Sequence, residues 1–217
     1  DHLGTDAELA SLLDGFFRPD SVLVVGVSPD PANLGRNIVQ NLLSFGYRGE
    51  VISAGLQPGV VFGRRIHRSI EQIGHPVDLA VVIVPAKIVP RIVDQAAEKG
   101  VKAMVVISAG FKETGPDGAK LEGLLAAKAR EAGIPLIGPN CLGLMNTDPA
   151  VSMNATFARS MPQAGNLAFF SQSGALCTSV LDYAEGRRMG FSKFISFGNK
   201  ADVTEVARAI GTDSRIG

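Results

Sequence analysis

Apolar residues along the first 140 positions come in short, nearly continuous runs rather than in strict alternation. Such runs are typical of strands that are buried on both faces of a parallel sheet. They occupy residues 21–27, 49–54, 78–86, 102–110 and 134–140. Segments with helical periodicity separate them, and strands alternating with helices predict an α/β fold. We therefore expect a Rossmann-like, doubly wound and mainly parallel sheet with right-handed crossovers.

Three helices are predicted between these strands. The first covers residues 34–46, with Ile38, Leu42 and Phe45 on one stripe and Gly46 as its end. The others fall within residues 86–100 and 118–133. Pro90 lies inside the second pattern, so that helix has to begin near Val89.

The pattern changes after Asn146. Residues 147–165 show no sustained period and contain two prolines, which predicts a linker over 148–165. The rhythm then resumes with a strand at 166–170, a helix at 173–188, a strand at 191–197 and a helix at 202–211. Two strands and two helices cannot bury both faces of a parallel sheet. We therefore predict one whole domain over 1–147 and an incomplete α/β domain over 166–217.

Composition narrows the classes of function. The 217 residues carry no formal net charge, with 46% hydrophobic and 19% charged residues, so nothing favours nucleic acid or an anionic membrane as a partner. No apolar run approaches the roughly 20 residues that span a bilayer. Two distant cysteines form no disulfide framework, which favours a cytoplasmic location. The three histidines and two cysteines do not cluster at metal-ligand spacing, so we expect no metal site.

The loop after the first strand predicts a ligand site. Gly26 ends the strand and Gly35 begins the helix, where a phosphate can approach the backbone. The loop is not G-x-G-x-x-G, and the strand at 49–54 ends without an acidic residue for a ribose hydroxyl, which counts against NAD. A turn with purely structural glycines remains the alternative.

Small residues also end three further strands, in "IVPA", "ISAGF" and "GPNCLG". Each alone could be a tight turn. At one edge of a sheet, however, they leave room for a flat or extended ligand.

A second candidate site begins the helix in "FFSQSGAL", where Ser173 and Gly174 follow a buried strand. Free N–H groups in the first turn of a helix suit a phosphate, although Ser173 could equally be a plain N-cap. A serine hydrolase is disfavoured because the first glycine of G-x-S-x-G is absent and every histidine precedes Ser173.

Six ordered motifs resemble the NDP-forming acyl-CoA synthetases over residues 16–213. They are "VVGVSPDPANLG", "AVVIVPA", "VVISAGF", "IGPNCLGLMN", "GNLAFFSQSGAL" and "FISFGNKADV". That family includes ADP-forming acetyl-CoA synthetase and, more distantly, the α subunit of succinyl-CoA synthetase. The same module also occurs in regulatory fusions.

The resemblance implies a CoA-binding domain followed by flavodoxin-like domains, with an ATP-grasp domain or subunit that binds ATP/ADP and Mg²⁺. It implies the reaction acid + CoA + ATP ⇌ acyl-CoA + ADP + phosphate, through an acyl phosphate and a phosphohistidine. The other expected partner is a small carboxylic acid, and we expect an oligomer.

The resemblance also assigns residues. The implied CoA site comprises Gly26, Ser28, Leu34, Gly35, Arg36, Val84, Pro85, Ala86, Ile107, Ser108, Asn140 and Cys141. Ser173 and Gly174 would hold the phosphate of the phosphohistidine.

Two departures from the family pattern limit the inference. The cation expected for the CoA 3′-phosphate is missing from "SAGLQPGVVFG", and Arg64 or Arg65 could replace it. No histidine lies in a suitable context either. We expect His67 on a solvated turn and His75 in a loop, and His2 precedes the first strand.

We therefore expect the chain to be inactive alone, as part of a longer ligase whose histidine lies beyond Gly217. The alternatives are a non-catalytic CoA-sensing module and, less favoured, an NAD-dependent oxidoreductase.

Overall fold

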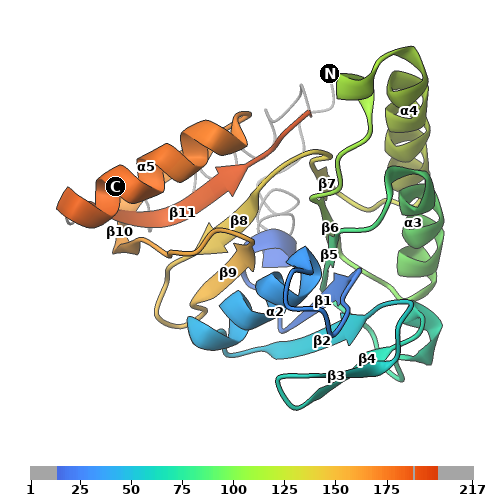
Figure 1. Ribbon diagram of the computed structural model, residues 1–217, viewed down its shortest axis with the longest axis horizontal. Helices are drawn as coiled ribbons and strands as arrows, with labels where there is room; N and C mark the ends of the chain where they lie inside the picture. The colour runs from blue at the N-terminus through green and yellow to red at the C-terminus, as the bar shows by residue number, and fades with distance from the viewer. Residues whose placement is uncertain (1–13, 188, 200–217) are drawn as a thin grey trace.

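The computed structural model describes residues 14–187 and 189–199, which form two β-sheets and the helices α2 to α5, and residues 14–17 are helical as well (Figure 1). The first sheet has seven strands in the order β3-β4-β2-β1-β5-β6-β7. They are β1 Ser21–Val25, β2 Glu50–Ala54, β3 Gly59–Val61, β4 Arg64–His67, β5 Leu79–Val82, β6 Ala103–Val106 and β7 Leu136–Ile137.

All neighbouring strands from β4 to β7 are parallel, and only β3 runs antiparallel, against β4. Without β3, this is the Rossmann strand order, in which the direction of winding reverses between β1 and β5. The predicted doubly wound parallel sheet is therefore confirmed.

Helices cover both faces of this sheet (Figure 1). Helix α2, Leu34–Ser44, packs on one face, while α3, Val89–Glu98, and α4, Pro116–Glu131, pack on the other. Short 3₁₀ turns lie at Ile70–Gln72, Ala86–Ile88 and Lys112–Thr114. Helix α3 begins at Val89 as predicted, because the missing N–H of Pro90 is tolerated in a first turn.

Successive residues of β1 explain why the strands read as continuous apolar runs. Val22 and Val24 pack with Ile38 of α2, whereas Leu23 and Val25 pack with the residues of α3 and α4. Both faces of each central strand are therefore buried, and no polar position is required.

The second sheet has the order β10-β11-β8-β9. Its strands are β8 Gly143–Asn146, β9 Met153–Thr156, β10 Gln163–Ser171 and β11 Gly190–Ser196. Strands β10 and β11 are parallel, and β8 runs antiparallel to both β11 and β9. Helix α5, Gly174–Arg187, covers one face by packing Cys177 and Leu181 against Phe194.

The expectation of an irregular linker over 148–165 is wrong, because this segment contains β9 and the start of β10. Strand β9 has no hydrophobic pattern that would predict it, because two of its four residues are polar. The side-chain oxygen of Asn154 accepts hydrogen bonds from the Thr156 N–H at 3.2 Å and from the Thr156 hydroxyl at 2.7 Å. These bonds let polar side chains be buried in a strand.

The two sheets share a hydrophobic cluster. Met153, Ala155 and Ile195 of the second sheet pack with Val22 and Ile38 of the first sheet and α2. The Asn41 side chain on α2 also donates to the carbonyls of Thr156, at 2.8 Å, and Ala158, at 2.7 Å. The second sheet and α2 therefore lie on the same side of the first sheet (Figure 1).

Across residues 14–187 and 189–199, none of the helices has both the length and the apolar character needed to cross a membrane. The helix predicted at 202–211 lies outside the described residues.

Candidate functional site

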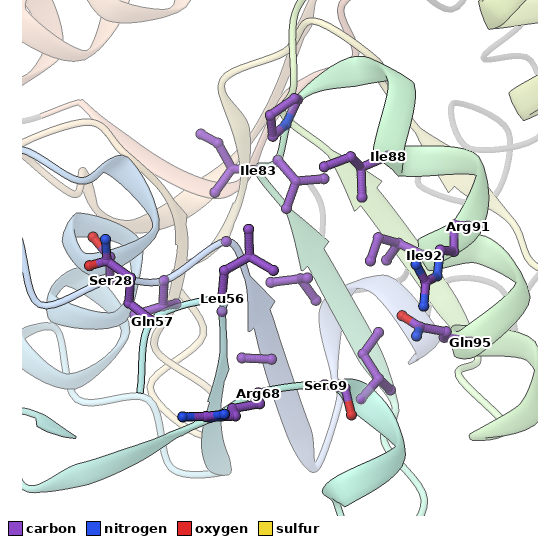
Figure 2. A pocket seen from close by; sticks show the side chains of 18 of the residues that line it. Ser28, Leu56, Gln57, Arg68, Ser69, Ile83, Ile88, Arg91, Ile92 and Gln95 are labelled. Atoms are coloured by element: carbon purple, nitrogen blue, oxygen red, sulfur yellow. The ribbon is translucent and has the colours of Figure 1, made fainter. Parts of the chain in front are cut away.

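A cavity of about 420 Å³ lies at the reversal point, beyond the carboxyl ends of β1, β2 and β5 (Figure 2). Reversal points are the usual ligand sites of doubly wound sheets. Loops from all three strands line the cavity together with the first turns of α3. Its lining residues include Gly26, Val27, Ser28, Asn33, Leu56, Gln57, Arg68, Ser69, Ile70, Val84, Pro85, Ile88, Arg91, Ile92 and Gln95.

Asn33 organises the loop between β1 and α2. Its Oδ1 accepts from the N–H groups of Arg36, at 2.7 Å, and Ser28, at 3.1 Å. Its Nδ2 donates to the Gly26 carbonyl at 3.0 Å. One side chain thus caps α2 and closes the loop back onto the end of β1.

The start of α2 presents two backbone donors. The Asn33 cap engages the Arg36 N–H, while the N–H groups of Leu34 and Gly35 have no acceptor within the described part of the chain. Unpaired donors in the first turn of a helix favour an anion such as phosphate.

The two glycines of the loop serve close packing of the backbone. A Cβ at Gly26, where φ is 108°, would lie 2.0 Å from the Ile83 carbonyl oxygen. A Cβ at Gly35 would lie 2.7 Å from the Gly26 carbonyl oxygen. Gly35 therefore lets α2 approach the end of β1, which supports the alternative in which the glycines of this loop have a structural role.

A second cavity, of about 380 Å³, adjoins the first and shares Ile83, Val84 and Pro85 with it. The remaining lining residues are Leu34, Ile107, Ser108, Ala109, Asn140, Cys141 and Phe157. The buried Ser108 hydroxyl accepts from the Val84 N–H at 3.0 Å, so it fixes the end of β5. This hydrogen bond fixes the backbone of Val84, which belongs to the wall that the two cavities share.

Cys141 and Asn140 close the far end of the second cavity. The Cys141 thiol is buried and lies 3.3 Å from the Val106 carbonyl, and burial raises its pKa to about 12. This thiol therefore stays protonated near neutral pH and is a poor nucleophile. Asn140 contacts the end of the second sheet, since its Nδ2 donates to Asn199 Oδ1 at 3.3 Å.

Comparison with known proteins identifies this arrangement. Residues 20–147, which hold the first sheet and nearly all of both cavities, match the family described as "CoA binding domain". The chain belongs to this family. Residues 164–215 match a second family, described as "Succinyl-CoA ligase like flavodoxin domain", so the resemblance inferred from the motifs is confirmed.

The relatives of this CoA-binding domain are acid–CoA ligases. The chain is 44% identical to acetate–CoA ligase [ADP-forming] I of Archaeoglobus fulgidus, with 89% of the chain and 28% of that protein covered. It is 42% identical to the α subunit of acetate–CoA ligase [ADP-forming] II of Pyrococcus furiosus, covering 88% of the chain and 41% of the subunit.

A solved structure of an acetyl-coenzyme A synthetase from Ca. Korarchaeum cryptofilum, in complex with phosphate and ADP, superposes with a TM-score of 0.88. It is 36% identical and covers 94% of the chain and 44% of its own length. The chain thus spans less than half the length of these three relatives.

Most of the residues predicted for the CoA-binding site line one of the cavities. The first cavity includes Gly26, Ser28, Val84 and Pro85, and the second adds Leu34, Ile107, Ser108, Asn140 and Cys141. Gly35, Arg36 and Ala86 line neither. The Arg36 guanidinium instead lies 4.7 Å from the ring centroid of Phe62, between α2 and the turn of the β3–β4 hairpin.

Several residues of the CoA-binding domain that line the first cavity were not predicted, above all Arg68, Arg91 and Gln95. Arg64 and Arg65, the suggested cations, belong to β4 and line neither cavity. The spacing of Arg91 and Gln95, four residues apart in the helix after β5, is a signal that could have found two of them, because it places both on one helix face.

The expectation for His67 is wrong, since this residue ends strand β4 rather than lying on a solvated turn. Its Nδ1 is buried and has no hydrogen-bond partner among the residues that the structure describes. Burial first, and then the charge of Arg65, lower the pKa of His67. His75 lies in a loop, as predicted, and its Nε2 is 3.4 Å from Glu50.

Ser173 and Gly174 lie at the start of α5, as expected. The expectation that a buried strand precedes them is wrong, because every residue of β10 is exposed or half-buried. The Ser173 hydroxyl accepts from the Leu176 N–H at 3.2 Å, and the Ser173 N–H donates to the Ser171 hydroxyl at 3.1 Å. Ser173 is therefore the N-cap of α5, and its exposed position leaves the start of the helix open to solvent.

Proposed function

We propose that this chain is the CoA-binding part of an ADP-forming acid–CoA ligase. The observation that supports this most is the pair of adjoining cavities at the reversal point of the sheet, joined at the end of β5. Coenzyme A has a compact nucleotide, a diphosphate and a long thin arm that ends in a thiol. Two cavities that share one wall suit such a ligand better than a single compact pocket does.

The residues of each cavity fit one part of the ligand. Apolar side chains such as Ile70 and Ile92 offer a surface for the adenine in the first cavity. The free N–H groups of Leu34 and Gly35 suit the diphosphate between the cavities. The arm would then follow Val84 and Pro85 into the second cavity.

The reactive end of the ligand would lie near Asn140 and Cys141. Because the Cys141 thiol stays protonated, the nucleophile of the reaction is the thiol of coenzyme A itself. The role of this part of the protein is therefore to bind and orient coenzyme A rather than to form a covalent intermediate with it.

The remaining steps are assigned to other parts of the ligase. We place a phosphohistidine and an ATP-grasp domain or subunit, with ATP/ADP and Mg²⁺, outside this chain. Residues 1–147 and 166–217 would act as two domains, with Ser173 and Gly174 binding the phosphate carried by that histidine. The overall reaction would be acid + CoA + ATP ⇌ acyl-CoA + ADP + phosphate, in an oligomeric cytoplasmic enzyme that acts on a small carboxylic acid.

Calorimetric titration of the chain with CoA and with NAD tests the binding function. We expect CoA to bind and NAD not to, because the end of β2 brings Leu56 and Gln57 to the cavity instead of an acidic residue. Acyl-CoA formation by the chain alone, from acid, ATP and CoA, would contradict the proposal that the phosphohistidine and the ATP-grasp domain or subunit lie outside this chain. A complete protein that binds CoA but never makes acyl-CoA would identify the CoA-sensing alternative.

A further inference from the structure

The far end of the second cavity lies against the start of α5. A Cβ added at Gly174 would lie 4.0 Å from the Cβ of Leu142, which directly follows Cys141 in the chain. The Leu142 N–H also donates to the hydroxyl of Ser196, the last residue of β11, at 3.0 Å. The proposed thiol end of the CoA site and the proposed phosphate site are therefore neighbours, although they belong to different parts of the chain.

The loop that follows β11 connects these two sites through its backbone. The Phe197 N–H donates to the Ser171 carbonyl, at the end of β10, at 3.0 Å. The Asn199 N–H donates to the Pro139 carbonyl at 2.9 Å. Between these two bonds, Gly198 has a φ of 60°, and a Cβ added there would lie 2.3 Å from the Pro139 oxygen. This loop therefore packs directly on the segment that closes the far end of the second cavity.

The Asn199 side chain adds a polar junction to these backbone contacts. Its Nδ2 donates to Glu113 Oε2 at 2.6 Å and to Glu122 Oε2 at 3.1 Å. Its Oδ1 accepts from Asn140 Nδ2 at 3.3 Å. The Lys112 ammonium group also donates to the Asn199 carbonyl. One residue thereby connects the end of β11 to the loop between β6 and α4, to α4 itself and to the lining of the second cavity.

The junction depends on an amide donor at position 199. Two carboxylates accept from this amide, and Glu113 Oε1 also accepts from the N–H groups of Gly110, at 2.6 Å, and Phe111, at 3.1 Å. Loss of solvent contact by itself would raise the pKa of Glu113, but the hydrogen bonds from Asn199 and from the backbone outweigh it and lower that pKa. An aspartate at position 199 would have no hydrogen to donate and would place a third negative charge beside the other two.

We infer that Asn199 is a positioning residue that holds the thiol end of bound CoA next to the phosphate site at the start of α5. This inference rests on the proposed function. In the step concerned, the CoA sulfur attacks the carbonyl carbon of the acyl phosphate and a C–S bond forms. The C–O bond to the phosphate breaks, and the phosphate leaves with the thiol proton. Each site holds one reactant, so their relative position decides the rate of this step, whereas the first cavity and the start of α2 hold the nucleotide end of CoA.

The test compares kcat with CoA affinity in the complete protein. Acyl-CoA formation from ATP, CoA and a panel of small carboxylic acids gives kcat with the acid that wild-type protein uses fastest, and calorimetric titration gives the Kd of CoA. We expect Asn199→Asp to lower kcat about tenfold to a hundredfold and to leave the Kd within about threefold of the wild-type value. Asn166→Asp is the matched control, because it adds the same charge at an exposed position of β10, and it should match wild type in both measurements.

Substitution of Glu113 links the effect to the junction itself. Glu113→Gln combined with Asn199→Asp exchanges donor and acceptor, because the glutamine can donate to the aspartate and still accept from the backbone of the loop. We expect this double variant to recover most of the lost kcat. Glu113→Gln alone sets two amide donors against each other and should also lower kcat. It disrupts the same junction without an added charge, so it carries the test if Asn199→Asp does not fold.

The outcomes separate this inference from the proposed function. If wild-type protein forms acyl-CoA from no acid in the panel, the proposed enzyme is excluded and the inference fails with it. If wild-type protein is active, three results would show that the inference is wrong while the proposed function stands. They are a wild-type kcat in both single variants, a loss of CoA affinity as large as the loss of kcat, and no recovery in the double variant. Melting temperatures above the assay temperature verify that a lower kcat does not reflect unfolding.

Discussion

At the scale of single residues, the loop between β1 and α2 depends on backbone contacts that exclude a side chain. Gly35 lies in the first turn of α2, where an added Cβ would approach the Gly26 carbonyl oxygen to 2.7 Å. That oxygen is fixed, because it also accepts from Asn33. A methyl group would therefore have to displace the helix from the end of the strand.

We expect Gly35→Ala to lower the free energy of unfolding by about 1–3 kcal/mol, the usual cost of overpacking. Gly123→Ala in α4 is the matched control, because an added Cβ there meets nothing within 4 Å. That control should be neutral or stabilise the protein by up to about 1 kcal/mol. Urea denaturation of both variants measures the difference, and equal stabilities would show that Gly35 is not needed for packing.

At the scale of elements, the N-cap of α5 is a serine whose hydroxyl already has a hydrogen-bond partner. Because Ser173 accepts from the Leu176 N–H, its removal must cost stability whether or not it also binds phosphate. Ser179→Ala offers a control on the same helix, since the Ser179 hydroxyl donates to the Ala175 carbonyl and caps nothing.

We expect Ser173→Ala to destabilise the protein by about 1 kcal/mol and Ser179→Ala to have little effect. If Ser173 also donates to a phosphate, phosphoenzyme formation in the complete protein should fall roughly tenfold to a hundredfold. Thermal unfolding and phosphoenzyme formation are measured on the same variant. Unchanged phosphoenzyme formation would leave Ser173 with the capping role alone.

The elements that the sequence predicts well are those whose pattern reflects burial. Strands β5 and β6 are apolar throughout, and β1 is apolar after Ser21, because both faces are covered; each was predicted from that pattern. The β3–β4 hairpin was not predicted. It forms the edge of the sheet, and Arg64 and Arg65 are exposed there, as charged residues on edge strands commonly are.

The residues of the candidate site also divide into those that a local sequence pattern predicts and those that it does not. Small residues at strand ends indicate where a ligand can approach, and most of them do line a cavity. Arg68 could not be placed from the sequence, because its contribution depends on how the loop after β4 is oriented toward the end of β2. The spacing of Arg91 and Gln95 indicates one face of α3, but not that this face lines the cavity. Such orientation is set by tertiary packing rather than by a local pattern.

At the scale of the whole molecule, the two sheets are joined by buried contacts rather than by a simple linker. The shared cluster places Met153 and Ala155 of β9, both fully buried, against the face of the first sheet that carries α2. The backbone is also held, since Asn146 donates to the Phe17 carbonyl at 2.6 Å. We therefore expect the described region to unfold in a single cooperative transition.

Asn41 tests this coupling. Its side chain donates to two carbonyls at the end of β9, so Asn41→Leu removes both bonds and leaves partly buried acceptors without a donor. We expect a loss of about 1–3 kcal/mol in the free energy of unfolding. Gln40→Leu, at the exposed neighbouring position, introduces the same side chain and should change stability by less than about 0.5 kcal/mol.

Urea denaturation, followed by circular dichroism and by hydrogen exchange at β1 and β11, distinguishes sheets that unfold together from sheets that unfold separately. If the sheets are coupled, Asn41→Leu lowers protection in both β1 and β11, because the contact it removes joins α2, which covers the first sheet, to β9 of the second. Two separate transitions in the wild-type protein, or a loss of protection confined to the second sheet, would contradict the coupling. In that case the shared cluster would be a surface contact between two independently stable units.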